Sequence, residues 1–227
     1  MPTKPIVILA ALAFALAAPT HAEDQAELGL RYAKVQQESL ELIKQYTWQS
    51  STKVTKAGEI KVEVTVDNRL NEKGEMVQEV ESAEVNARRK RGMRGRAQDE
   101  QLAAGEAFLE KVAATTGAYI FMSKGQEVDF FDKATITDGT GTDAGKTVVT
   151  AAGVLSSGDT VTKHIDPATL HPSKILFTTT IDGTAVTGEV LLRAIEEGPN
   201  VPRMATITVT ANDQVIETEF VNYKKSL

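Results

Sequence analysis

The sequence predicts an α+β fold in which one large curved antiparallel sheet, an unclosed barrel, is covered by two amphipathic helices. Long stretches alternate apolar and polar residues with a period of two, which predicts strands that have one buried and one solvated face. Two other segments place apolar residues three and four positions apart, which predicts helices with one apolar stripe. A second sheet would leave both stripes without a partner, so helices packed on a single sheet are favoured.

The N-terminus has the three parts of an export signal. Lys4 supplies the positive charge, Ile6 to Ala18 is an uncharged apolar run, and Thr20-His21-Ala22 offers a cleavage site. The apolar run of 13 residues is shorter than the roughly 20 that a spanning helix needs, so an uncleaved anchor is the weaker alternative. We expect residues 1–22 to be removed and residues 23–227 to form one periplasmic domain.

Composition excludes several classes of protein. The expected mature chain carries 24 Lys and Arg against 31 Asp and Glu, a balance that does not suit general nucleic-acid binding. The chain has no cysteine, which excludes thiol catalysis, thiolate metal sites and a lipid attached through an N-terminal cysteine. About 205 residues can bury one core, and we expect a monomer.

The first half of the domain reads as a helix followed by three strands. Residues 24–45 carry an apolar stripe that consists of Leu28, Tyr32, Val35, Leu42, Ile43 and Tyr46. Alternation then predicts strands over residues 46–54 and 60–66, and a turn leads into a third strand over residues 75–81.

Residues 82–127 interrupt the sheet as a helical and basic insert. Its second amphipathic helix presents Leu102, Phe108, Leu109 and Val112, and Gly117 is the predicted stop. Before this helix lies a basic run, in which Gly92 and Gly95 predict a mobile arm and not a rigid helix. The cations of the run are Arg88, Arg89, Lys90, Arg91, Arg94 and Arg96.

From Glu127 to the C-terminus, strands and turns alternate. The predicted strands begin with the alternation of Val128, Phe130, Ala134 and Ile136, and continue over residues 147–155, 160–166, 174–181, 189–194, 204–211 and 214–223. Asp182-Gly183 is the strongest hairpin signal and Asn212-Asp213 a weaker one. The prolines at 167, 172, 199 and 202 are all expected between strands.

This order of elements resembles the outer-membrane lipoprotein carriers, the LolA-like fold. The resemblance lies in an N-terminal helix that runs into Tyr46-Thr47-Trp48, an alternating strand after Gly58, and a closing strand at 217–223. Residues 46–80 also resemble a group of uncharacterised exported bacterial proteins. The family resemblance implies a barrel wrapped around helices, with a gap between them that takes acyl chains.

Catalytic and metal-binding motifs are not convincing. Residues 139–147 mimic a phosphate-binding loop, but threonine stands where the first glycine is required and a strand follows where a helix should begin. A metal site at His164, Asp166 and His171 is conceivable, but a surface histidine beside a proline turn is favoured. We therefore expect no metal, no cofactor and no enzymatic activity.

The leading functional hypothesis is an exported carrier or chaperone for a lipid, a lipoprotein or another apolar ligand. The alternative is a structural or interaction protein of the cell envelope with a filled core and no small ligand. The predicted ligand contacts on the concave apolar face are Tyr46, Trp48, Ile60, Val62, Val64, Phe130 and Ile136. The basic run is a candidate contact for an anionic membrane surface or an acidic partner, with a solvated segment as the alternative.

Overall fold

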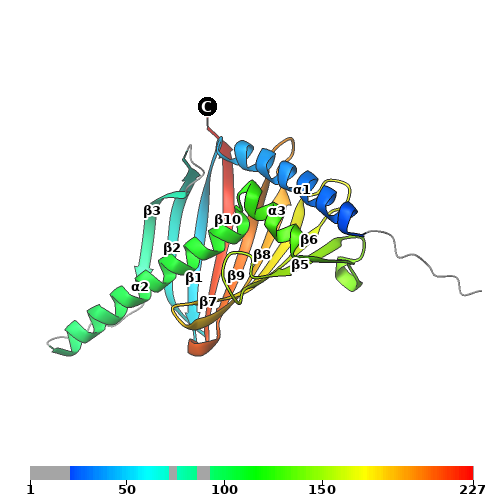
Figure 1. Ribbon diagram of the computed structural model, residues 1–227. Helices are drawn as coiled ribbons and strands as arrows, with labels where there is room; N and C mark the ends of the chain where they lie inside the picture. The colour runs from blue at the N-terminus through cyan, green and yellow to red at the C-terminus, as the bar shows by residue number, and fades with distance from the viewer. Residues whose placement is uncertain (1–20, 72–75, 86–92, 227) are drawn as a thin grey trace, which may run out of the picture.

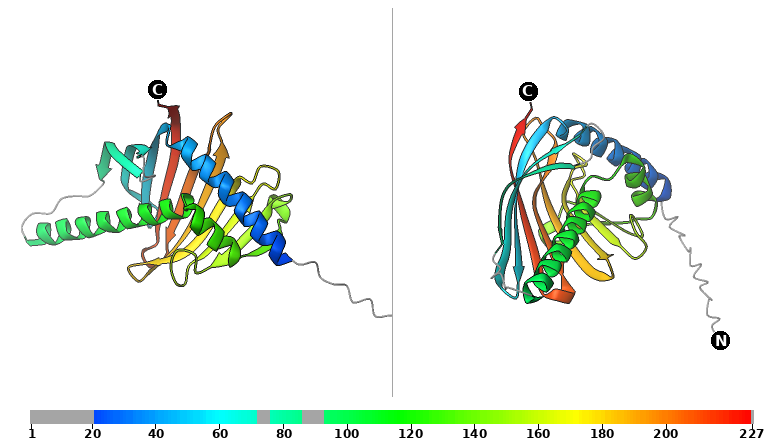
Figure 2. Two further views of the ribbon diagram at one scale, coloured as in Figure 1. Left: turned by 45° about the horizontal axis from the view of Figure 1, so that its top comes forward. Right: turned by 90° about the vertical axis from the view of Figure 1, so that its left-hand side faces the viewer.

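The described residues of the chain form one open sheet of ten strands with three helices on one of its faces (Figures 1 and 2). The computed structural model describes residues 21–71, 76–85 and 93–226; of residues 21–24, 93–102 and 212 it describes the backbone only. The helices are α1 (His21–Ile43), α2 (Met93–Ile120) and α3 (Lys124–Asp132). The strands are β1 (Tyr46–Lys56), β2 (Glu59–Leu70), β3 (Met76–Val85), β4 (Thr135–Asp138), β5 (Thr147–Ala152), β6 (Thr160–Ile165), β7 (Pro172–Ile181), β8 (Thr184–Ala194), β9 (Asn200–Val209) and β10 (Gln214–Lys225).

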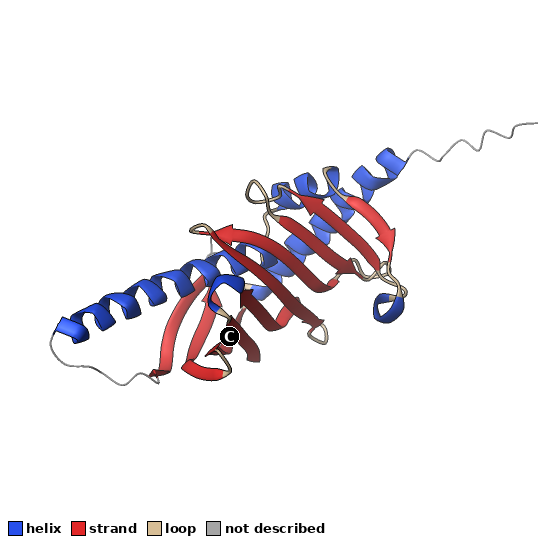
Figure 3. Ribbon diagram, turned by 90° about the horizontal axis from the view of Figure 1, so that it is seen from below, coloured by secondary structure: helices blue, strands red, loops and turns tan. Residues whose placement is uncertain are grey.

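The sheet consists of two meanders, β1 to β3 and β4 to β10, which are joined by the pairing of β1 with β10. Its order is β3-β2-β1-β10-β9-β8-β7-β6-β5-β4, and every neighbouring pair is antiparallel. The pairing of β1 with β10 brings residues from the two ends of the domain side by side. Because β3 and β4 remain as edges, the sheet curves around the helices without closing (Figures 2 and 3), and the predicted unclosed antiparallel sheet is confirmed.

Helix α3 corrects the prediction of a strand that begins at Glu127. Val128 and Phe130 lie in this helix, because Ser123 and Gln126 form a capping box that starts it just before the apparent alternation. The described part of the chain therefore contains three helices where two were predicted. The helix buries Glu127, Phe130 and Phe131, which share one helical face, where strand alternation would have paired Val128 with Phe130.

Helix α2 also differs from its prediction at both ends. Gly117 does not stop it, because the helix continues to Ile120. Gly95 lies inside its first turns, so Arg94 and Arg96 belong to a helix where a mobile arm was predicted. The other cations of the basic run, Arg88 to Arg91, lie outside the described residues.

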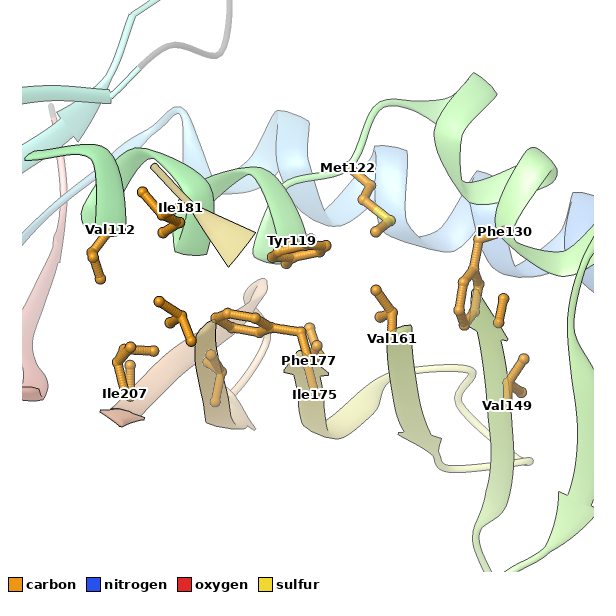
Figure 4. Close-up of a cluster of buried hydrophobic side chains, with 14 of the residues drawn as sticks. Val112, Tyr119, Met122, Phe130, Val149, Val161, Ile175, Phe177, Ile181 and Ile207 are labelled. Atoms are coloured by element: carbon orange, nitrogen blue, oxygen red, sulfur yellow. The ribbon is translucent and has the colours of Figure 1, made fainter. Parts of the chain in front are cut away.

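The core lies between the inner face of the sheet and the helices, and a stack of two rings occupies its centre (Figure 4). Tyr119 of α2 stacks on Phe177 of β7, with centroids 4.5 Å apart and planes 21° apart. The Phe177 ring crosses its cross-strand partner Gly188, where an added Cβ would lie 2.2 Å from the ring. Gly188 is therefore the residue that lets an aromatic ring lie flat on the sheet.

The turns confirm one local prediction and correct another. Asp182 and Gly183 both have positive φ, as a two-residue hairpin between β7 and β8 requires, so the strongest predicted hairpin is confirmed. Pro172 and Pro202, however, lie within strands. Pro172 is the first residue of β7, and Pro202 pairs with Leu192 next to a register shift, both of which are places where a missing backbone donor is tolerated.

Candidate apolar ligand site between the sheet and helix α2

A cavity of about 220 Å³ lies between α2 and the inner face of five strands. Its walls are mainly apolar, with valines from the sheet opposite aliphatic side chains of the helix. Its apolar lining includes Val54, Val62, Val64, Val66, Met76, Leu109, Val112, Ile120, Phe121, Ala205, Ile207, Ile216 and Phe220. An apolar space with a few polar groups is the usual form of a site for a small apolar ligand.

The cavity is long and narrow. Along the helix its lining extends from Leu109 to Ile120, a rise of about 17 Å at roughly 1.5 Å per residue. Along β1 it extends from Val54 to Trp48. A small volume stretched over this length suits an extended chain better than a compact ring system.

A row of polar side chains crosses the floor of the cavity, and these groups hydrogen-bond to one another. Asn68 donates to the hydroxyl of Ser50 at 2.9 Å and accepts from Gln78 at 2.9 Å. The hydroxyls of Thr52 and Thr218 lie 2.9 Å apart and share a hydrogen bond. Because these groups already hydrogen-bond to one another, covering them with an apolar ligand leaves no donor or acceptor newly unpaired and lowers the affinity little.

Trp48 stands at the end of the cavity that lies nearest the last turn of α1. It is 2% exposed, and its ring stacks on Tyr223 with centroids 5.7 Å apart. Ile43 of α1, Leu70 of β2 and Val201 of β9 form a small core cluster with it. The Nε1 of Trp48 is buried and has no hydrogen-bond partner.

A second hollow, of about 410 Å³, lies on the β3 side of α2 and borders the cavity. The two share lining from Met76 and Gln78 of β3 and from the Ala113–Gly117 face of α2. Farther along β3, Val80 is 66% exposed. The start of β3 therefore borders both hollows, and the first turns of α2 extend past this edge of the sheet (Figure 1).

Two larger hollows lie on the other face of the sheet and suit an apolar ligand less well. One, of about 270 Å³, is lined mainly by polar residues such as Gln49, Asp67 and Arg69. The other, of about 520 Å³, is lined mainly by threonines of β6 to β9. The space enclosed by the helix is the better candidate because apolar walls surround it.

Three of the seven predicted ligand contacts line this cavity: Trp48, Val62 and Val64. The other four do not, each for a local reason. Tyr46 precedes the lined part of β1, and Ile60 is 44% exposed beyond a register shift in β2. Phe130 is buried in α3, and Ile136 of β4 packs at the opposite edge of the sheet.

Sequence reasoning missed the residues that close the cavity from the helix and from the C-terminal strands. Val112, Thr116 and Ile120 follow a helical spacing that could have extended the predicted stripe of α2 past Gly117. Ile207 and Ile216 lie opposite one another on β9 and β10, but only the pairing of β10 with β1 brings them to this site.

His164 was predicted to lie on the surface, and the structure corrects this. His164 is buried on the outer face of the sheet and not on the surface, because Asp143 in the β4–β5 loop covers it, with Oδ1 3.2 Å from Nδ1. Asp143 also accepts from Lys174 at 3.1 Å. In the described part of the chain, no group of three or more acidic or histidine side chains is placed to hold a metal ion.

Solved structures with a similar fold were found, whereas no family model and no curated protein matches the chain. A DUF1329 family protein from Desulfovibrio piger aligns with a TM-score of 0.47 at 8% identity, over 91% of this chain and 93% of its own. A candidate outer membrane lipoprotein-sorting protein domain from Vibrio parahaemolyticus aligns with a TM-score of 0.44 at 11% identity, over 88% and 92%. A LolA superfamily protein from Nitrosomonas europaea aligns with a TM-score of 0.39 at 10% identity, over 84% and 93%.

These similarities concern the fold alone. Among the helices of the described residues, none is both long enough and apolar enough to cross a membrane.

Proposed function

We propose that this protein is a non-enzymatic carrier that holds the apolar chain of a lipid or acylated ligand between α2 and the sheet. The observation that carries the proposal is the long apolar cavity under the helix. A protein whose only task was to present a surface would gain stability by filling this space, because empty apolar volume lowers the free energy of unfolding.

The site of action in this proposal is the periplasm, reached after removal of residues 1–22. Helix α1 begins at His21, so the cut would remove only its first two residues and leave the packed turns around Tyr32 intact. Protein from the envelope fraction should begin at Glu23 in N-terminal mass spectrometry. Recovery of intact Met1 from that fraction would contradict this part of the proposal.

The binding proposal is tested by the lipids that the protein retains. Protein purified from its native compartment is extracted with organic solvent, and the extract is analysed by mass spectrometry. Val64→Phe fills the middle of the cavity and should lower retained lipid several-fold. Thr65→Phe is the matched control, because the neighbouring residue of the same strand points to the other face of the sheet.

If wild type and Thr65→Phe retain lipid and Val64→Phe does not, the cavity is the binding site. Equal retention by all three proteins would place any lipid elsewhere. If none of them retains lipid and none binds added fatty acyl chains, the alternative of an envelope interaction protein is favoured.

A further inference from the structure

The only tryptophan of the chain carries a hydrogen-bond donor that nothing in the described structure satisfies. Trp48 is 2% exposed, and its Nε1 has no partner. Buried side-chain donors are nearly always paired, so an unpaired one needs an explanation. One explanation is that a bound ligand supplies the acceptor. Trp48 lines the cavity, so the ligand in question would be one bound there.

The other polar groups of the cavity do not share this feature. Ser50, Asn68 and Gln78 form one hydrogen-bonded row. Thr116 donates to the carbonyl of Val112 at 2.8 Å, within its own helix. Among the described residues that line the cavity, Trp48 alone has a buried side-chain nitrogen or oxygen without a partner.

The packing neighbours of Trp48 supply no hydrogen-bond acceptor for its Nε1. Its packing neighbours Ile43, Leu70 and Val201 have apolar side chains. Tyr223 covers its ring but donates its own hydroxyl to the carbonyl of Pro202 at 2.7 Å. The donor is thus held in a fixed place by well-packed neighbours, which is the condition under which one hydrogen bond selects a ligand.

We propose that Trp48 Nε1–H donates to the carbonyl oxygen of an acyl ester or acyl amide bound in the cavity. The alkyl chain of the ligand then lies along Val64 and Val66 toward Leu109, with the carbonyl at the Trp48 end. This inference rests on the proposed carrier function. It adds a ligand class, carbonyl-bearing chains and not plain hydrocarbons, and an orientation.

The test compares two probes of equal chain length, methyl dodecanoate and n-dodecane, on lipid-stripped protein. Affinities are measured by displacement of a fluorescent alkyl probe from wild type and from Trp48→Phe. Wild type should prefer the ester by about tenfold, the value of one neutral hydrogen bond, and Trp48→Phe should lose most of that preference while still binding dodecane.

A second readout does not depend on the variant. The chain has one tryptophan, so ¹⁵N-labelled wild type gives a single indole N–H signal in a proton–nitrogen spectrum. The ester should move this signal downfield by clearly more than the alkane does.

The outcomes separate the two proposals. If both probes bind with equal affinity and the indole signal responds equally to both, the hydrogen bond is wrong and the carrier function stands. The hydrogen bond to the ligand is also wrong if the free protein already shows a hydrogen-bonded indole that the ester leaves unchanged, as a bound water would cause. If neither probe binds, the carrier function itself fails, and the inference fails with it.

Discussion

Lys163 donates to both carboxylate oxygens of Glu127 at 2.7 Å, and the two side chains are only 1% and 2% exposed. This ion pair joins β6 to α3 through the core. The ammonium group also lies 5.3 Å from the ring centroid of Tyr32 and 5.0 Å from that of Phe130. Burial raises the pKa of Glu127 and lowers that of Lys163, and each partner opposes the shift of the other.

Breaking this pair from one side should be far worse than removing it. Lys163→Met leaves a buried carboxylate without a partner and should lower the free energy of unfolding by about 3–5 kcal/mol. For a domain of this size that corresponds to a fall in melting temperature of roughly 10 °C. The double variant Lys163→Met/Glu127→Leu should recover much of this loss, because no charge then remains buried. A double variant no more stable than the single one would show that the pair contributes net stability.

The close contact of Gly188 with Phe177 should make this glycine hard to replace. An added Cβ would lie 2.2 Å from the ring, so Gly188→Ala should lower the free energy of unfolding by about 1–3 kcal/mol through overpacking. Gly125→Ala in α3 is the matched control, because nothing lies within 4 Å of its added Cβ, and it should be neutral or stabilising. Urea unfolding of the two variants compares them directly, and equal midpoints would argue against the ring contact.

His164 and His171 should make stability fall in mild acid. Burial lowers the pKa of His164 from its ordinary value of 6.5, as does Lys174, while Asp143 opposes the shift. Burial lowers the pKa of His171 as well. Between these lowered pKa values and about 6.5 the unfolded chain binds more protons than the folded one. The stability that the two neutral histidines contribute is therefore complete above about pH 6.5, and it is lost as the pH falls toward their lowered pKa values.

The measurement is urea unfolding between about pH 7.5 and about pH 5.5, a range that brackets the ordinary histidine pKa. The wild type should lose stability across this range, and the double variant His164→Gln/His171→Gln should lose less. A wild type as stable at the lower pH as at the higher one would contradict the lowered pKa of the two histidines.

The basic run predicts attraction to anionic surfaces. Replacing its six cations, Arg88, Arg89, Lys90, Arg91, Arg94 and Arg96, with serine should reduce co-sedimentation with anionic vesicles, because each cation near such a surface contributes on the order of 1 kcal/mol. The binding of wild type should weaken between about 0.1 M and about 1 M salt as the charges are screened, and neutral vesicles serve as the control. If both proteins pellet equally with anionic vesicles, the run is a solvated segment.

The strand content of this protein could be predicted from the sequence because alternation and turn chemistry are local. The valines of β2 reveal which face of that strand is buried, and Asp182-Gly183 specifies its hairpin whatever surrounds it. Helix α1 could likewise be predicted, because its apolar residues recur at three- and four-residue spacings. The error at α3 arose because Val128 and Phe130 alternate as strand residues do, whereas the helix buries Glu127, Phe130 and Phe131 and begins at the capping box of Ser123.

Tertiary structure alone decided what lies over the apolar face. Alternation places Val62 and Val64 on the inner side of the sheet, but it cannot say whether a helix fills the space above them or leaves a cavity. That depends on α2, which is separated from these strands in the sequence and held by the packing of Tyr119 on Phe177. The ion pair of Lys163 with Glu127 could not be predicted from the sequence either. Its partners come from separate elements, and both side chains become buried only when those elements pack together.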